Sequence, residues 1–273
     1  MNPGWRAQRS RRPEVPWLTD LEPWTTGLVA QEGLKLWTAG DQAALGLRAG
    51  GVVYPVFRGP LDPQLDPGAR EILDRLGEAW CLMGPQAWVA ACERWMPRSV
   101  VTHRIAYHFQ VRPAGGPEVP DGAGELRVGH SDDSELLFPL QEGYEKEEVL
   151  FDPREFQPLA SRLHFWKALR HQQIVALWEN GRPVAKAGTN ALTQAWAQIG
   201  GVYTRPDRRG LGLQKRLMAF LLARLSAQGR GSCLFVKKTN APAAGLYRSL
   251  GFEDKGDFMI VYGQRLAWVP GFR

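Results

Sequence analysis

The sequence predicts an α/β (α+β) protein organised as two domains, and three stretches carry this prediction. Residues 199–225 place an apolar strand directly before a glycine-rich basic loop and an amphipathic helix. Asn180-Gly181 lies between two apolar runs, which is the strongest short signal for a β-hairpin. Residues 113–124 are rich in proline and glycine and interrupt the composition of the chain. Strands and helices are therefore expected on both sides of a linker.

The part before this linker is expected to hold a basic arm and a small domain. Residues 1–16 predict a flexible basic arm, because arginines are frequent there and no long apolar segment follows them. Residues 17–112 predict an N-terminal α/β domain with helical patterns near 71–76 and 86–95 and an alternating strand at 102–111. It contains no glycine-rich cradle, so we expect it to bind no cofactor.

Residues 113–124 are expected to link this domain to a second one, residues 125–273. The patterns of the second domain predict its helices and strands in chain order. They are a strand from 125 to 128, a helix from 132 to 148, a helical region from 153 to 171, a hairpin of 174–178 and 183–189, a strand ending at 204, a helix at 213–225, a strand at 232–236, a helix from 240 or 241 to 250, and a strand at 258–262.

The loop after residue 204 has the composition of a phosphate-binding turn. Gly210 and Gly212 let the backbone turn and approach a ligand closely. The free N–H groups and the positive dipole end of the following helix favour an anion. The basic residues expected to add mobile positive charge there are Arg205, Arg208, Arg209, Lys215 and Arg216. The loop therefore predicts a pyrophosphate cradle, although a tight strand-to-helix turn with a solvated basic face has the same local pattern.

Two ordered motifs extend this pattern. Residues 206–214 read Pro-Asp-Arg-Arg-Gly-Leu-Gly-Leu-Gln, and residues 240–252 contain Asn-x-x-Ala-x-x-Leu-Tyr-x-x-x-Gly-Phe. Together they resemble the GNAT superfamily of acyl-CoA-dependent N-acetyltransferases, with one departure at Gln214, where a small residue is usual. The resemblance spans residues 125–263 and implies a GNAT-like central mixed, mostly antiparallel sheet flanked by helices. It is also compatible with a tandem protein whose first domain is a degenerate acetyltransferase-like half.

The resemblance implies acetyl-CoA as acyl donor. Backbone groups at the end of the long strand would bond the pantetheine arm, and the loop and helix start would bind the phosphates. Asn240 matches a family residue that contacts pantetheine, although it is also a suitable helix cap. The cofactor-binding residues expected from the resemblance are Val202, Tyr203, Thr204, Arg209, Gly210, Leu211, Gly212, Leu213, Gln214, Asn240 and Tyr247.

Two residues are candidates for catalysis. Tyr247 matches the family tyrosine near the cofactor sulfur, where a phenol could protonate the leaving thiolate; the alternative is simple packing under its helix. Many relatives carry a glutamate on the long strand, but residues 198–201 here are Gln-Ile-Gly-Gly. Glu148, which shares a helix face with Tyr144, is the candidate base. A water or a histidine could replace it, and a solvated acidic face is the alternative interpretation.

Composition limits the classes of function. The net charge of +6 favours anionic partners, and coenzyme A is one that requires no nucleic acid. Cys81, Cys92 and Cys233 are widely spaced, which predicts buried thiols in a reducing compartment and indicates no metal site. No apolar run has the length of a membrane span, so we expect a soluble, cytoplasmic protein without a membrane partner.

Two functions from different classes remain open. The first is an N-acetyltransferase acting on a primary amine of an unidentified small molecule or protein. The second is a catalytically silent acyl-CoA-binding module whose N-terminal domain recognises a partner, an interpretation favoured by Gly200 and Gln214. Nucleic-acid binding through the arginine-rich arm is not expected; it would appear as a steeply salt-dependent affinity.

Overall fold

A computed structural model describes most of the chain as two compact units. The described residues are 5–8, 18, 21–26, 35–48, 51–59, 66–76, 80–93 and 101–263. Of these described residues, those up to 109, those at 236–240 and those at 255–263 form the first unit, and residues 110–235 and 241–254 form the second.

The sheet of the first unit has the strand order β1-β2-β3-β4-β5-β12. Neighbouring strands are antiparallel except β4 and β5, which are parallel and are connected through α3. Its elements are β1 (Arg6–Gln8), β2 (Lys35–Ala39), β3 (Ala43–Arg48), β4 (Val52–Phe57), α3 (Asp66–Leu76), β5 (Cys81–Pro85), α4 (Gln86–Glu93) and much of β6 (Val101–Arg112) and β12 (Glu253–Gly263).

The expectation of a flexible arm over residues 1–16 is wrong for the part that the structure describes. Arg6–Gln8 form β1 and pair with β2, and Trp5 is buried in a cluster with Leu45 and Phe57. Burial of one large aromatic side chain favours order in this short segment. The rest of the expected arm lies outside the described residues.

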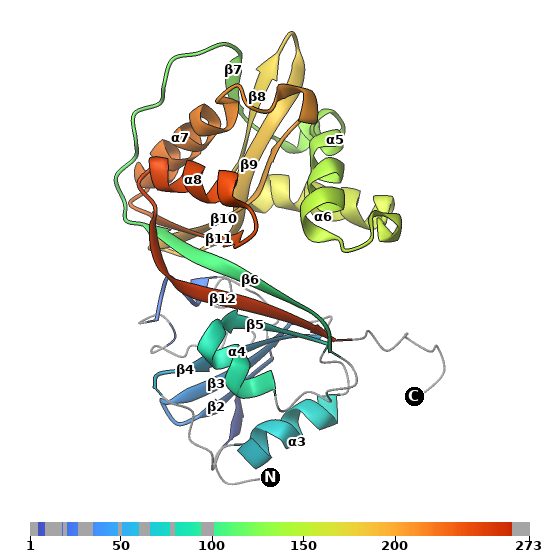
Figure 1. Cartoon of the computed structure of the whole chain (residues 1–273), viewed down its shortest axis with the longest axis vertical. Helices are drawn as coiled ribbons and strands as arrows, with labels where there is room; N and C mark the ends of the chain where they lie inside the picture. The colour runs from blue at the N-terminus through green and yellow to red at the C-terminus, as the bar shows by residue number, and fades with distance from the viewer. Residues whose placement is uncertain are drawn as a thin grey trace. The chain divides into compact units, whose positions relative to one another are not determined.

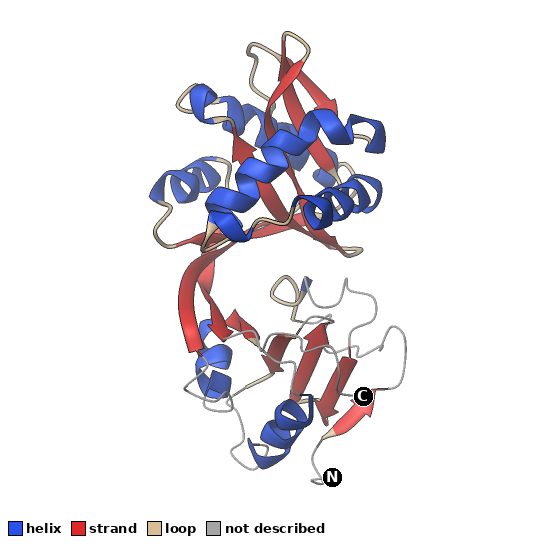
Figure 2. Cartoon of the chain, turned by 90° about the vertical axis from the view of Figure 1, so that its right-hand side faces the viewer, coloured by secondary structure: helices blue, strands red, loops and turns tan. Residues whose placement is uncertain are grey.

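The second unit has the strand order β11-β10-β9-β8-β7, antiparallel except for the pair β10 and β11. Helices cover both faces of this sheet, α5 and α6 on one and α7 on the other (Figures 1 and 2). The predicted mixed, mostly antiparallel sheet flanked by helices is thus confirmed. Its elements are β7 (Glu125–Val128), α5 (Ser134–Tyr144), the π-helical turn η4 (Glu145–Val149), α6 (Pro158–His171), β8 (Ile174–Glu179), β9 (Arg182–Leu192), β10 (Trp196–Thr204), α7 (Leu213–Ser226), β11 (Gly231–Lys237) and α8 (Ala241–Ser249).

The turn between β8 and β9 confirms the predicted hairpin. Asn180 and Gly181 both have positive φ, 49° and 73°, as a type I′ turn requires. The two strands that they join are buried over most of their length and are inner strands of the sheet of this unit.

Residues 113–124 run along α7 (Figure 1). The N–H of Gly115 donates to Ser226 Oγ at 2.7 Å, and Arg216 donates to the carbonyl oxygens of Ala123 and Gly124 at 2.6 and 3.1 Å. This exposed segment therefore belongs to the second unit, whereas residues 255–263, expected in the second domain, fall in the first. The two-domain division drawn from the sequence stays a prediction.

Two further expectations concern side chains and length. The side chains of Cys81, Cys92 and Cys233 are buried, as predicted. Among the described residues, every helix is too short or too polar to cross a membrane.

Candidate active site

The site begins where β10 and β11 separate. These parallel strands pair only through Trp196–Gln198 and Gly231–Cys233 within the described chain. From Ile199 to Thr204, β10 continues without β11 beside it, so backbone groups on that edge are available to a ligand. Each strand is followed by a helix, and the region beyond the carboxyl ends of neighbouring parallel strands is where α/β sheets commonly bind ligands.

A β-bulge interrupts β10 within this open stretch. Gly200 pairs with Gly188 and Tyr203 with Lys186, so Gly201 and Val202 together face a single residue of β9. Gly201 has a φ of 62°, which glycine adopts without steric cost. A Cβ at Gly200 would collide with the side chain of Asn190. The backbone conformation therefore favours glycine at position 201, and a side chain at position 200 would require Asn190 to move.

The loop after β10 leaves the N-terminus of α7 uncovered. Gly210 and Gly212 have φ values of 78° and 72°, and a Cβ at either position would have no atom within 4 Å. Gly212 is the N-cap of α7, no side chain bonds to this helix start, and its first turn contains no acidic residue. The first N–H groups of α7 and its positive dipole end are therefore open to an anion. The residues present fit a pyrophosphate.

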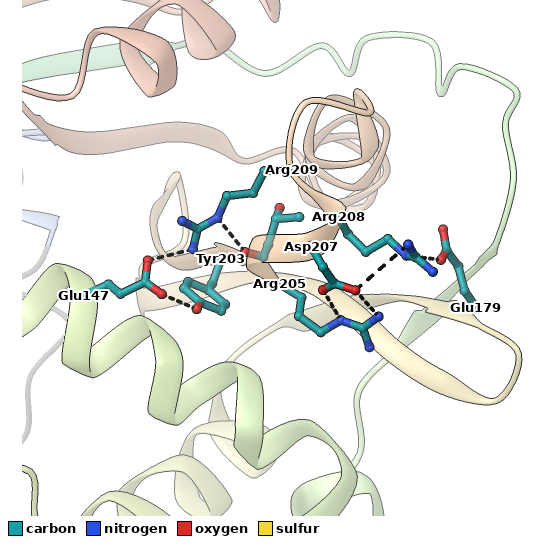
Figure 3. Close-up of polar contacts among 8 residues, drawn as sticks. Glu147, Glu179, Tyr203, Arg205, Asp207, Arg208 and Arg209 are labelled. Atoms are coloured by element: carbon teal, nitrogen blue, oxygen red, sulfur yellow. Dashed lines mark hydrogen bonds and ion pairs between the residues drawn. The ribbon is translucent and has the colours of Figure 1, made fainter.

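The arginines of this loop are not mobile charges, contrary to the expectation from sequence. Arg205, Arg208 and Arg209 each form an ion pair with a carboxylate. Arg216, on α7, instead donates hydrogen bonds to backbone carbonyls of residues 120–124. A charge-assisted pair fixes a guanidinium more tightly than water does. The pairs are Arg205–Asp207, Arg208–Glu179 at 2.9 Å and Arg209–Glu147 at 2.6 Å (Figure 3). Glu179, the last residue of β8, is one of these partners.

Arg209 belongs to a network with Glu147 and Tyr203 (Figure 3). Its Nε donates to the carbonyl of Thr204 at 3.0 Å, and its guanidinium lies 5.3 Å from the centre of the Tyr203 ring. The Tyr203 hydroxyl donates to Glu147 Oε1 at 2.6 Å; burial and this contact raise the pKa of Tyr203 to about 12.

Glu147 is a residue that the sequence reasoning missed in favour of its neighbour Glu148. Burial opposes its ionisation, but hydrogen bonds from Tyr203 and Arg209 prevail and lower its pKa. The carboxylate is thus charged at neutral pH. Its partners lie far away in sequence, so no local signal distinguished it from the other acids of that turn.

Gln214, the departure from the family motif, connects the helix start to the strand end. Thr204 Oγ1 donates to Gln214 Oε1 at 2.8 Å. The amide nitrogen Nε2 is buried and has no hydrogen-bond partner among the described residues. An unsatisfied buried donor costs on the order of 1–3 kcal/mol, so an acceptor supplied by a ligand would be favourable here.

The two candidate catalytic residues lie within electrostatic range of each other. Tyr247 is buried in α8, and burial, followed by the charges of Tyr144 and Glu148, raises its pKa. The end of α8 has the predicted glycine, since the N–H of Phe252 donates to the Tyr247 carbonyl at 3.1 Å and Gly251 has positive φ. The catalytic roles of Tyr247 and Glu148 stay predictions.

Lys186 is the second residue that the sequence reasoning missed. It lies in the middle of β9 with 3% of its surface exposed, and its Nζ donates to the carbonyl of Gly201 at 2.7 Å. The Nζ is also 4.8 Å from the centre of the Tyr144 ring. Burial lowers the pKa of Lys186 to about 7, although Glu145 opposes this effect. The available signal was a lysine within the apolar run Val-Ala-Lys-Ala after the Asn-Gly turn.

The remaining expected residues are distributed between the units. Val202, Leu211 and Leu213 lie on β10, on the loop and at the start of α7, and Leu211 is exposed. Asn240 directly precedes α8 but falls in the first unit, where its N–H donates to the Lys237 carbonyl at 2.8 Å. Its contact with a cofactor stays a prediction.

Comparison with known proteins finds a family match within the second unit. Residues 139–252 match the family model described as the acetyltransferase (GNAT) family. No curated protein sequence matches the chain.

Several solved structures share the fold. An acetyltransferase assigned to the GNAT family from Novosphingobium aromaticivorans is 24% identical, with a TM-score of 0.56 over 81% of this chain and 88% of that one. A GCN5-related N-acetyltransferase-like protein from Streptococcus suis is 17% identical, with a TM-score of 0.57 over 90% and 96%. A tandem GNAT protein from the clavulanic acid biosynthesis pathway is 15% identical, with a TM-score of 0.52 over 93% and 89%. Residues 139–252 are therefore similar to the acetyltransferase (GNAT) family, and the solved structures share its fold.

Proposed function

We propose that the protein is an N-acetyltransferase that moves an acetyl group from acetyl-CoA to a primary amine of a small molecule or a protein. The observation that carries this proposal is the open edge of β10 leading into an uncapped helix start. The match of residues 139–252 to the GNAT family model supports acyl-CoA-dependent acetyl transfer.

Acetyl-CoA is the substrate that the residues around this edge would hold. Backbone groups of Val202 to Thr204 would bind its pantetheine arm. Residues 209–214 would direct N–H groups at its pyrophosphate, where the helix dipole adds favourable charge. The unpartnered Nε2 of Gln214 supports the proposal, since a bound acceptor oxygen would satisfy it.

The transfer requires two proton movements. The acceptor amine must lose a proton as its nitrogen bonds the acetyl carbon, and the sulfur of coenzyme A must gain one as the thioester bond breaks. Tyr247 would supply the second proton; its raised pKa keeps the phenol protonated at neutral pH. Glu148 would receive the first, directly or through water. Its electrostatic coupling to Tyr247 supports a shared site.

The second candidate is a silent acyl-CoA-binding module with a partner-recognition N-terminal domain. The observation in its favour is the Gly200-Gly201 pair, which stands where the family resemblance leads us to expect an acid and in which Gly201 has a positive φ. In this case the first unit, as a degenerate acetyltransferase-like half, would contact the partner.

Release of free thiol from acetyl-CoA separates the two functions. The protein is incubated with acetyl-CoA and, in turn, polyamines, amino acids, amino sugars and lysine-containing peptides. We expect at least one class to raise release above the amine-free rate. Saturable binding of acetyl-CoA without release for any class would favour the silent module.

A further inference from the structure

The peptide group that follows Gly201 is held by a side chain from β9. Lys186 Nζ donates to the Gly201 carbonyl at 2.7 Å, and a Cβ at Gly201 would lie 3.0 Å from the same nitrogen. The backbone of Gly201 also forms a hydrogen bond with the Tyr144 hydroxyl. These contacts cross three elements and meet at the bulge of β10.

The direction of the Val202 N–H follows from the hydrogen bond between Lys186 and the Gly201 carbonyl. A trans peptide is planar, so the C=O of Gly201 and the N–H of Val202 point in opposite directions. The only cis bond in the described chain is Glu22–Pro23. Val202 lies in the bulge and beyond the pairing with β11, so ladder pairing does not fix its N–H. Lys186 therefore orients this donor.

We propose that Lys186 is a positioning residue: its bond to the Gly201 carbonyl turns the Val202 N–H away from the Lys186 Nζ, where this N–H can donate to the carbonyl oxygen of a bound acyl thioester. The identity of the acceptor rests on the proposed function. The orientation of the peptide group between Gly201 and Val202 is independent of that function, because it follows from the contact between Lys186 and Gly201.

The surroundings of Lys186 make this effect sensitive to pH. Glu145 is the acid that acts on it from η4, and this carboxylate accepts hydrogen bonds from Ser161 and Gln141. The rings of Tyr144 and Phe165 face its Nζ from α5 and α6.

Tyr203, with Glu147 bonded to its hydroxyl, lies opposite Lys186 in register. With a pKa of about 7, Lys186 passes from ammonium to amine near neutrality. The ammonium is the stronger donor, and a stronger bond to the carbonyl polarises the N–H of the same peptide.

Amide NMR of the whole chain with isotope-labelled valine tests this inference without an activity assay. The Val202 signal, assigned by its loss in Val202→Ala, should shift with a midpoint near pH 7. The shift should disappear in Lys186→Met and persist in Lys167→Met, a matched change of an exposed lysine on α6. A Val202 signal that Lys186→Met leaves unchanged would overturn the proposal. If that variant fails to fold, a Val202 signal in the unaltered protein that does not follow the titration of Lys186 at any pH would overturn it.

Kinetics provide the second readout. Lys186→Met should lower kcat about 10- to 100-fold, since a misdirected donor loses part of the stabilisation typical of such groups, while the affinity for acetyl-CoA stays unchanged. If Val202 titrates as expected but no amine releases thiol, the proposed function fails and the orienting role stands. If thiol is released and Lys186→Met changes neither kcat nor the Val202 signal, the orienting role fails and the function stands.

Discussion

Buried Lys186 makes the stability of the protein depend on pH. Its pKa in the folded state is about 7, below the ordinary value of 10.5 that applies to an unfolded chain. Between these values the unfolded state binds more protons, so the free energy of unfolding rises with pH, by at most about 1.4 kcal/mol per unit. Below pH 7 both states are protonated and burial of the charge opposes folding.

Denaturant unfolding between pH 6 and 9 measures this contribution. The stability of the unaltered protein minus that of Lys186→Met should be constant below about pH 7 and increase above it. The variant lacks the amine, so the subtraction removes most effects of other titrating groups. Parallel stability curves across this range would show that the amine is solvated.

Substitution of Tyr247 tests whether its phenol acts in catalysis or its ring only packs. In Tyr247→Phe the ring that packs 6.0 Å from Phe252 survives, but the proton donor is lost. We expect turnover to fall about 10²- to 10⁴-fold with unchanged affinity for acetyl-CoA. Phe252→Leu is the control for altered packing. Wild-type turnover in Tyr247→Phe would assign protonation to water.

Individual elements were predictable where their signals are local. The hairpin turn at 180–181, the glycine loop before α7 and the end of α8 each depend on residues adjacent in sequence. The contacts that define the site are not local. Arg209 and Glu147 are 62 residues apart, and Tyr203 and Glu147 are 56 apart. Sequence pattern therefore predicted the strands and helices of the site but missed Glu147, Lys186 and the pairing of the arginines.

The start of α7 gives a prediction with a matched control. Gly212 and Gly229 both have left-handed φ, 72° and 75°, and open space around a Cβ, but they lie at opposite ends of α7. Glutamate at either position should cost about 1–2 kcal/mol in backbone strain. Only Gly212→Glu places negative charge at the proposed pyrophosphate site.

Calorimetry should thus find that Gly212→Glu abolishes acetyl-CoA binding while Gly229→Glu keeps it. Both variants should unfold at similar denaturant concentrations, which separates lost binding from lost structure. Equal affinity in the two variants would place the phosphates elsewhere.

The whole molecule combines two units through strands that have residues in both. β6, β11 and β12 each cross from one unit to the other along the chain, and residues 258–262 of β12 pair with β5. A cut in the exposed segment 113–124 leaves β5 and β12 on different fragments. Because this pairing lies inside the first unit, we expect the fragments to remain associated.

Limited proteolysis followed by gel filtration tests this expectation. Arg216→Ala removes the hydrogen bonds that hold residues 120–124 on α7 and should speed cleavage there. The nicked protein should elute as one species in native buffer and separate in denaturant. Separation in native buffer would show that residues 1–109 fold without β12 and would favour the boundaries expected from sequence.

Hydrogen–deuterium exchange with and without acetyl-CoA tests most directly whether acetyl-CoA binds at the open edge of β10. Peptides covering Ile199 to Leu213 should exchange more slowly when acetyl-CoA is bound, because their free N–H groups would then donate to it. Peptides from β2 to β4 should be unchanged. Saturating acetyl-CoA that leaves residues 199–213 unprotected, or protects only the first unit, would contradict the proposed site.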